Sequence, residues 1–225
     1  MPFTDRTLSF LVENCLMDSR EWFHAHKEEY ETFIVDPMAE VLTAIAPAML
    51  EIDPEFIAIP KVGKSISRLW RDTRYVKDGS IFRDYVWCTF IREKYRGLPD
   101  MWFAVSPRGA QWGCGWYWTG TETMAALRKK VLADDPEWLA ANAAFERQSA
   151  FKIVGEKYKK SPYTAYPEEK RRWLDQRNIT LQTENDPDII FTDGFADRLI
   201  EDFRSIAPVY KFFVNNAVRW EYERD

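Results

Sequence analysis

The richest concentration of chemically useful side chains lies between residues 61 and 96. This stretch carries ten basic and only four acidic side chains, although the whole chain of 225 residues has a net charge of −5. Four of the cations fall within ten residues: Arg68, Arg71, Arg74 and Lys77. Guanidinium groups match the geometry of carboxylates and phosphates. We therefore predict a binding site for a small anionic ligand at these four side chains, in a binding protein or an enzyme.

Two carboxylates in the same stretch support a second interpretation. Asp72 and Asp78 are close enough in sequence to pair with the basic side chains, and ion-pair networks resemble functional sites. The chain would then be a non-catalytic interaction or scaffold module. Adjacent arginines lower the pKa of a carboxyl group, so these two residues suit ligand orientation better than general acid catalysis. An open basic hollow favours binding, and a cluster sealed by carboxylates favours scaffolding.

The two histidines and three cysteines do not form the pattern of a metal site. His24 and His26 are two residues apart, so on a helix they point about 200° apart and cannot share a metal ion. His26 lies on an apolar stripe with Trp22, and we include both as supporting residues of the arginine cluster. No Gly-rich phosphate loop is present. We expect no metal, no cofactor and no ligation by the scattered cysteines, Cys15, Cys88 and Cys114.

The elements that must position the cluster are helices around a central run of strands. Period-two patterns predict strands at 65–71, 85–92, 101–106 and 110–118, and one more at 179–183. Pro107 and Gly109 predict a tight turn between two of them. Helical patterns fill the first and last thirds of the chain. We therefore predict an α+β fold, with a central antiparallel sheet flanked by N-terminal and C-terminal helices, in a single domain of residues 1–225.

The N-terminal helices have recognisable ends. Asp18 and Ser19 are rival N-caps of a helix that begins near residue 19, and Asp36 with Pro37 predicts the start of another. Pro47 should bend or end that later helix. The first helix is expected to bury a stripe at helical spacing, formed by Leu8, Leu11, Val12 and Leu16.

The last predicted strand of the central run places three tryptophans on one face: Trp112, Trp116 and Trp118. They could stack on bases or sugars, but the core face of a central strand is the favoured interpretation. The opposite face carries Gly113 and Gly115, which leave room for another backbone, a helix or a ligand.

Two segments resemble a widespread bacterial family of conserved hypothetical proteins, a domain of unknown function. Members typically read Asn-Arg-Glu-Trp-Phe, and here residues 19–23 read Ser-Arg-Glu-Trp-Phe. The family also has Arg-Asp-Thr-Arg-Phe-Ser-Lys-Asp, which matches Arg71-Asp72-Thr73-Arg74-Tyr75 and Lys77-Asp78. Directly after Asp78 the sequence departs from the family pattern. The resemblance nevertheless runs along nearly the whole chain and includes Ala207-Pro208 near the C-terminus. The resemblance implies a class without an assigned activity.

Composition narrows the remaining choices. The start of the chain lacks the basic region and apolar run of a signal peptide, and no stretch has about 18 uninterrupted apolar residues. We expect a cytoplasmic protein with reduced cysteines and no membrane partner. The negative net charge argues against nucleic acid as a partner, whereas a local basic surface suits a small anion. The sequence leaves the oligomeric state open.

Overall fold

The computed structural model describes residues 2–72, 74, 79–92 and 97–218. Its elements, in chain order, are α1 (Asp5–Met17), α2 (Arg20–Ala25), α3 (Lys27–Tyr30), η1 (Glu31–Val35), α4 (Asp36–Ile52), β1 (Phe56–Ile57), β2 (Val86–Arg92), β3 (Asp100–Ser106), β4 (Gly109–Gly115), α5 (Thr121–Leu132), α6 (Pro136–Glu146), β5 (Lys152–Val154), α7 (Glu168–Leu174), β6 (Thr180–Gln182), η3 (Pro187–Phe191), α8 (Phe195–Ser205) and α9 (Ala207–Asn216).

The chain divides into two compact units, each built from three stretches of sequence. Unit 1 comprises residues 1–90, 102–112 and 184–200, and unit 2 comprises residues 91–101, 113–183 and 201–225. Strands β2, β3 and β4 contribute residues to both units. The single domain expected from the sequence remains a prediction.

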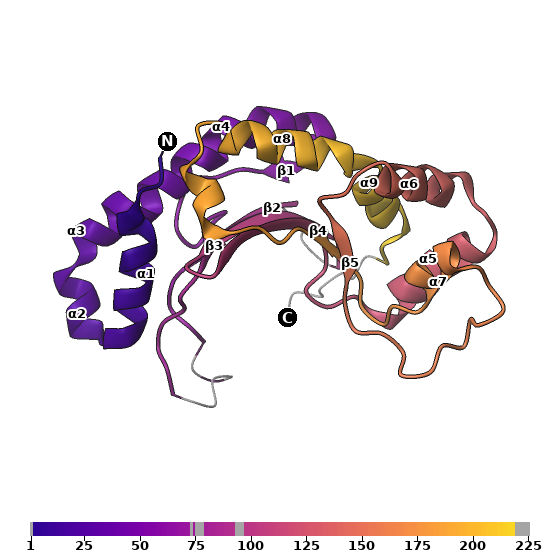
Figure 1. Ribbon diagram of the computed structural model, residues 1–225, viewed down its shortest axis with the longest axis horizontal. Coiled ribbons are helices and arrows are strands. Elements are labelled where there is room, and N and C mark those ends of the chain that lie inside the picture. The colour runs from indigo at the N-terminus through magenta and orange to yellow at the C-terminus, as the bar shows by residue number, and fades with distance from the viewer. Residues whose placement is uncertain (1, 73, 75–78, 93–96, 219–225) are drawn as a thin grey trace, which may run out of the picture. The chain divides into compact units, whose positions relative to one another are not determined.

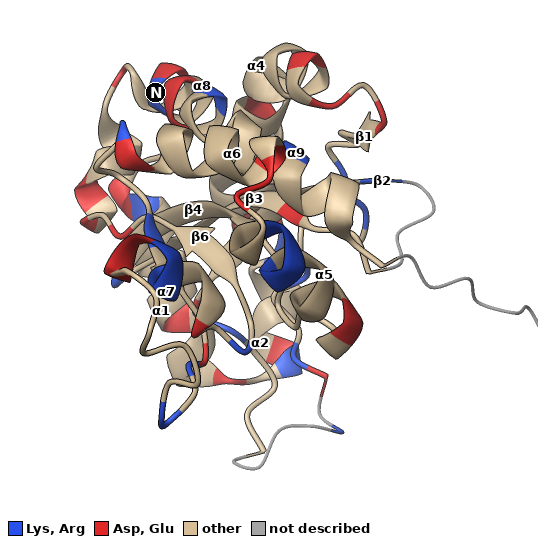
Figure 2. Cartoon of the chain, turned by 90° about the vertical axis from the view of Figure 1, so that its right-hand side faces the viewer, with Lys and Arg blue, Asp and Glu red and all other residues tan. Residues whose placement is uncertain are grey.

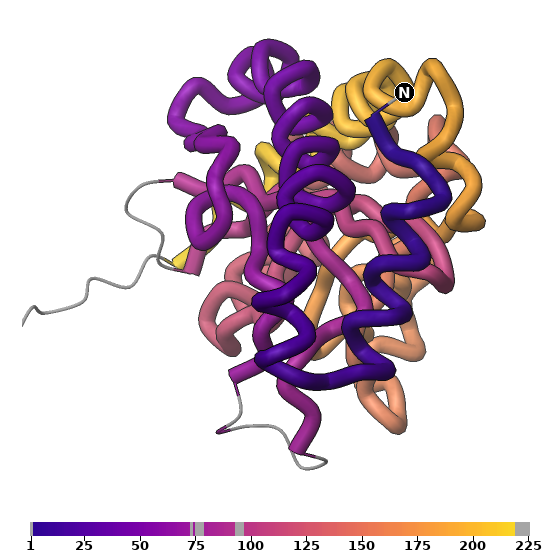
Figure 3. The backbone as a smooth tube through the Cα atoms, turned by 90° about the vertical axis from the view of Figure 1, so that its left-hand side faces the viewer, coloured from indigo at the N-terminus to yellow at the C-terminus, as the bar shows by residue number. Residues whose placement is uncertain are grey.

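The N-terminal helices of unit 1 form a continuous group in which α1 contacts α2 and η1 (Figure 3). The helix that should start at Asp36 in fact runs on from α3 through the π-helical turn η1, and Asp36 is helical rather than a cap. Pro37 has no N–H to donate to the carbonyl of Phe33. The hydroxyl of Thr7 donates to that carbonyl at 2.9 Å instead. Pro47 does not end α4, which continues to Ile52.

The sheet confirms the predicted fold class. In the described chain six strands form an antiparallel sheet in the order β1-β2-β3-β4-β6-β5. Alternate residues of β2 and β3 are buried, and the residues between them are half-buried. Helix α4 and the start of α8 lie over the same face of these strands (Figure 1). In the core of unit 1, Phe195 packs edge-on against Phe103 and Trp112.

Three expectations about these elements were wrong. Residues 65–71 are not a strand but a loop with isolated bridges at Ile66 and Trp70, because serine hydroxyls replace part of the backbone ladder there. Strand β4 stops at Gly115, so Trp118 is 67% exposed while Trp112 and Trp116 are core residues. Helix α1 buries a stripe one position earlier than expected, formed by Thr7, Phe10, Leu11 and Asn14.

Unit 2 holds a second group of helices, in which α6 packs on α9 and α5 packs on α7. Trp173 of α7 contacts Phe212 and Phe213 of α9, and its indole N–H donates to Asn142 at 2.9 Å. Basic side chains are conspicuous on α5 and α7 (Figure 2). Many of them are paired with acids: Lys130 with Asp135 and Glu137, Lys170 with Asp134, and Arg172 with Glu146. An ion-pair network is therefore present in unit 2.

One helical run, Lys27–Ile52, is long and apolar enough by length and composition to cross a membrane. Half of its most apolar window is buried within the chain, and Met38, Leu42 and Ile45 have no exposed surface. These are properties of a core helix, and the structure is compatible with a soluble protein.

Candidate functional site

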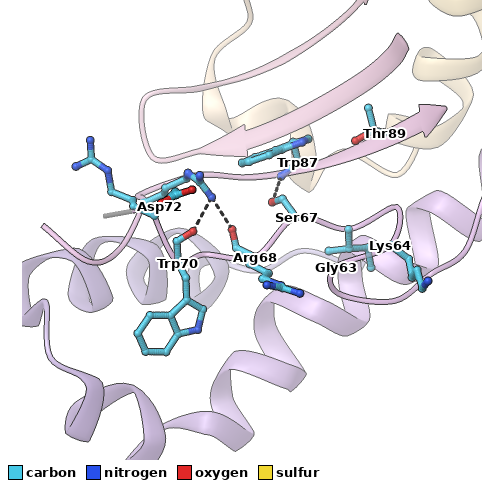
Figure 4. A pocket seen from close by; sticks show the side chains of 11 residues that line it. Gly63, Lys64, Ser67, Arg68, Trp70, Asp72, Trp87 and Thr89 are labelled. Carbon is cyan, nitrogen blue, oxygen red and sulfur yellow. Dashed lines mark hydrogen bonds between the residues drawn. The ribbon is translucent and has the colours of Figure 1, made fainter. Parts of the chain in front are cut away.

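A tight loop of unit 1 sets the position of the basic side chains. Gly63 has a φ of +79°, in the left-handed region that favours glycine. The hydroxyl of Ser65 accepts from the N–H of Ile59 at 3.0 Å, and the carbonyl of Ser65 accepts from the N–H of Thr89 at 2.9 Å. The loop is thereby tied to β2. Lys64 and Arg68 extend from this fixed backbone (Figure 4).

A hollow of about 470 Å³ opens between this loop and β2. Four cations line it, Lys64, Arg68, Arg71 and Arg83, together with the rings of Trp70 and Trp87 and the hydroxyl-bearing residues Ser67 and Thr89. Figure 4 shows Trp87 and Thr89 on the strand, across from Lys64 and Arg68 on the loop. The only carboxylate among the residues that line the hollow is Asp72. We call this hollow the basic pocket.

Arg83 holds the edge of the basic pocket together. Its guanidinium donates to the backbone carbonyls of Arg68 at 3.1 Å and Trp70 at 2.8 Å. The same guanidinium lies over the ring of Trp87, 5.0 Å from its centroid. The side chain of Arg83 thus supplies hydrogen bonds to two loop carbonyls that a regular β-strand would bond to a neighbouring strand. Arg83 fixes the loop to the strand and also adds positive charge to the pocket.

Arg68 and Arg71 both line the basic pocket. The guanidinium of Arg68 lies against Gly63, where an added Cβ would be 3.2 Å from its Nη2. Arg71 donates a hydrogen bond to the hydroxyl of Ser80. Lys64 and Arg68 form no ion pair with a carboxylate anywhere in the described residues, and both are exposed.

Arg74 is paired differently from Arg68. Its Nε and Nη2 donate to the two carboxylate oxygens of Asp72 at 2.9 and 2.7 Å, and its backbone N–H also bonds to that carboxylate. Asp72 therefore forms a local turn with its own backbone, as aspartate commonly does. The hydrogen bonds from Arg74 lower the pKa of the Asp72 carboxyl group. Asp72 is held as an anion, which leaves it unsuited to act as a general acid.

Of the other residues proposed from the sequence, Trp22 and His26 do not line the basic pocket. Lys77 and Asp78 lie outside the described residues. Trp22 and His26 stack on each other with ring centroids 4.0 Å apart, and His26 Nδ1 lies 2.8 Å from the carbonyl oxygen of Trp22. Two residues of α2 contact Trp70 of the pocket lining: the ring of Phe23, with centroids 5.4 Å apart, and the guanidinium of Arg20, 5.7 Å from the ring centroid.

Sequence reasoning missed several residues of the basic pocket, among them Lys64, Arg83 and Trp87. Lys64 and Arg83 belong to the same basic stretch, but they are too far from Arg71 in sequence to stand out. The signal for Trp87 was available, because the period-two pattern of strand 85–92 places residues 85, 87 and 89 on one face. The fold brings this face against the loop through the backbone bond from Ser67 to Trp87.

The described residues contain no group of three or more His, Cys, Asp or Glu side chains arranged to hold a metal ion. The chemistry at the basic pocket is that of hydrogen-bond donors, positive charge and aromatic rings.

A family model for conserved hypothetical proteins, DUF2461, matches residues 6–212. Because the match covers most of the sequence, the chain belongs to this family. No curated protein matches the chain, and no solved structure matches it either.

Proposed function

We propose that this protein binds a small anionic ligand, with a phosphate or carboxylate group, in the basic pocket. One observation carries the proposal: Lys64 and Arg68 line a hollow and have no ion-pair partner in the described residues. The nearest carboxylate, Asp72, is already bonded to Arg74. Cationic side chains that line a concave surface without a carboxylate partner are suited to bind an anion.

The anion would be held by side chains rather than by backbone. The N–H groups of Gly63, Lys64 and Ser65 donate to carbonyls within the loop, so they do not form a phosphate-binding nest. Lys64, Arg68 and Arg71 would supply most of the donors, and the hydroxyls of Ser67 and Thr89 would add others. Binding of this kind weakens as ionic strength rises, because exposed charges are screened. The negative net charge of the chain argues against a long polyanion as the natural ligand.

The alternative is a scaffold module whose arginines serve only structure. The Asp72–Arg74 pair and the ion pairs of unit 2 favour this role for their own residues. They do not extend to Lys64 and Arg68, which is why we favour binding at the basic pocket.

Thermal denaturation with potassium phosphate tests the proposal, with potassium chloride at equal ionic strength as the reference. A ligand at about 100 times its dissociation constant stabilises a protein by about 2.7 kcal/mol. We expect phosphate to stabilise the wild type and Arg147→Ala, and to have little effect on Arg68→Ala. Arg147→Ala is the matched control, because it also removes one exposed guanidinium that has no ion pair in the described residues, and Arg147 does not line the basic pocket.

Two results would overturn the proposal. The first is a wild type that phosphate, sulfate, citrate and acetate stabilise no more than chloride does. The second is equal loss of the phosphate effect in Arg68→Ala and Arg147→Ala, which would indicate a response to net charge rather than to the pocket.

We also propose that the protein works in the cytoplasm. The free cysteines support a reducing compartment, since Cys88 and Cys114 are buried as thiols and Cys15 is half-buried. Burial raises the pKa of the Cys15 thiol to about 11, so this side chain is not a reactive thiolate.

A further inference from the structure

A second hollow, of about 400 Å³, lies beside the basic pocket in unit 1. Its lining includes Tyr85, Ala104, Ser106, Arg108, Gln111 and Glu184. Ala104 and Gln111 are half-buried residues of β3 and β4, on the sheet face whose alternate residues are not in the core. Small side chains at positions 104 and 106 give this hollow its depth. We call it the ring pocket.

The ring pocket differs from the basic pocket in charge. Arg108 forms an ion pair with Asp84, which raises the pKa of its guanidinium. Its charge is therefore balanced inside the protein. By contrast, the amide of Gln111 and the carboxylate of Glu184 have no hydrogen-bond partner in the described residues. The ring pocket thus offers an amide and a carboxylate to a neutral group that bears N–H or O–H donors.

Two stacked rings connect the pockets. Tyr85 lines the ring pocket, Trp87 lines the basic pocket, and their ring centroids are 5.5 Å apart with planes 28° from parallel. The two residues lie two positions apart in extended chain and so share one face. Tyr85 is 39% exposed, which leaves part of its ring accessible. One ligand could therefore contact both pockets across this pair of rings.

We infer that the ligand joins one anionic group to a planar ring with a hydrogen-bonding edge, as a nucleoside monophosphate does. The phosphate lies among Lys64, Arg68 and Arg71. The ring packs against Tyr85, and its edge donates to Glu184 and exchanges hydrogen bonds with Gln111. Aromatic stacking and a bidentate amide are the usual means by which proteins hold a base. This inference rests on the proposed function, because the phosphate half of the ligand occupies the basic pocket.

Calorimetric titration of the full chain with inorganic phosphate, ribose 5-phosphate, AMP and GMP tests it. We expect at least one nucleotide to bind about tenfold more tightly than ribose 5-phosphate, the gain that one stacked base provides. Tyr85→Leu and Gln111→Ala should each reduce this preference and leave the affinity for ribose 5-phosphate unchanged. Tyr85→Phe should retain it. Tyr117→Leu, at a tyrosine whose side chain is fully exposed in unit 2, is the matched control and should have no effect.

The outcomes separate this inference from the proposed function. If ribose 5-phosphate and phosphate bind but no nucleotide binds more tightly, the inference is wrong and anion binding stands. If Tyr85→Leu and Gln111→Ala retain the full preference for a nucleotide, the ring lies elsewhere and the inference is again wrong. If Arg68→Ala binds every phosphate compound as the wild type does, both proposals are wrong. Unchanged affinity of the Tyr85 and Gln111 variants for ribose 5-phosphate also shows that they are folded.

Discussion

Asp18 is the residue that joins the N-terminal helices to the segment leading into β2. It ends α1 with a φ of +39°, and its carboxylate accepts from the N–H groups of Ile81 at 2.9 Å and Phe82 at 3.0 Å. The rival residue Ser19 is the true N-cap of α2, since its hydroxyl accepts from the N–H of Trp22. Arg83 follows directly, so the carboxylate of Asp18 helps to place a residue of the basic pocket.

Asp18→Ala should therefore destabilise the protein by about 1–3 kcal/mol, because two backbone N–H groups lose their acceptor. The matched control is Asp134→Ala, at the other described non-glycine residue with a positive φ. Both variants place alanine in a left-handed conformation, but no backbone N–H in the described residues donates to Asp134, whose half-exposed carboxylate pairs with Lys170. Urea denaturation measures both. Equal loss of stability would show that Asp18 matters only through its backbone.

Asp100 gives the protein a distinctive response to pH. Burial raises the pKa of this carboxyl group from 3.8 to about 7, and its Oδ1 has no hydrogen-bond partner among the described residues. A raised pKa means that the folded state holds the proton more tightly than the unfolded state does. Its contribution to stability is therefore complete below about pH 4 and is lost as the pH rises through 7.

Asp100→Asn should remove this loss, because an amide stays neutral. The variant should gain stability relative to the wild type as the pH rises from 4 to 8. Denaturant unfolding of both proteins at several pH values gives the difference, in which the other titrating groups cancel. A difference that does not change with pH would contradict the assignment to Asp100.

At the residue scale, the sequence identified the basic segment but not the arrangement of its side chains. Charge density identified Arg68 and Arg71, which both line the basic pocket. Arg74 turned to Asp72 because a side chain two residues away is within reach of a bidentate bond. Lys64 and Arg83 join the basic pocket only through the pairing of residues 67–71 with 81–87. No local pattern reports such a long-range pairing.

At the scale of the elements, the glycines of β4 explain how the sheet continues. Gly113 pairs with Gln182 of β6, and an added Cβ there would overlap the carbonyl oxygen of Leu181. Another backbone was one of the three occupants that the sequence allowed on this face. The periodicity could not choose among them, because it describes one strand at a time.

Gly113→Ala should consequently destabilise the protein by about 1–3 kcal/mol or prevent β4 from pairing with β6, since the clash is with backbone that cannot rotate away. Gly194→Ala is the control, because an added Cβ at Gly194 meets nothing within 4 Å. Surface changes of that kind stay within about 0.5 kcal/mol. Thermal unfolding of the two variants, followed by circular dichroism, checks the contrast. Equal stability of the two would refute the crowding at Gly113.

Helix α1 shows why burial was harder to predict than helicity. The spacing of Leu8, Leu11, Val12 and Leu16 correctly indicated a helix. The buried face is centred on Phe10 and Leu11, and Phe10 packs against the rings of Trp22 and Tyr30. Leu16 is left 79% exposed. On the same face the hydroxyl of Thr7 donates to the carbonyl left open by Pro37, so long-range contacts decided which side of α1 is buried.

At the scale of the whole molecule, the connectivity predicts cooperative unfolding. Each unit consists of three separate stretches, and β2, β3 and β4 supply residues to both. Neither unit is a continuous segment that could fold first along the chain. We expect tryptophan fluorescence and far-ultraviolet circular dichroism to follow one common urea transition. Two separate transitions would contradict the single domain predicted from the sequence.

The charge distribution also belongs to this scale. The chain is acidic overall, yet the basic pocket of unit 1 places four cations around one hollow, while several cations of unit 2 are paired with acids. A local positive field on a negative molecule attracts small anions and disfavours long polyanions. The central claim is therefore a claim about position: an anion binds between Lys64 and Arg68.

A crystal of the full chain soaked in tungstate tests this position most directly, because tungstate resembles phosphate and scatters anomalously. We predict an anomalous peak in the basic pocket, within hydrogen-bond distance of Lys64 and Arg68 and away from neighbouring molecules in the crystal. The peak should be absent in Arg68→Ala and present in Arg147→Ala. A pocket without tungstate, at a concentration that stabilises the protein in solution, would contradict the account, as would a peak that persists in Arg68→Ala.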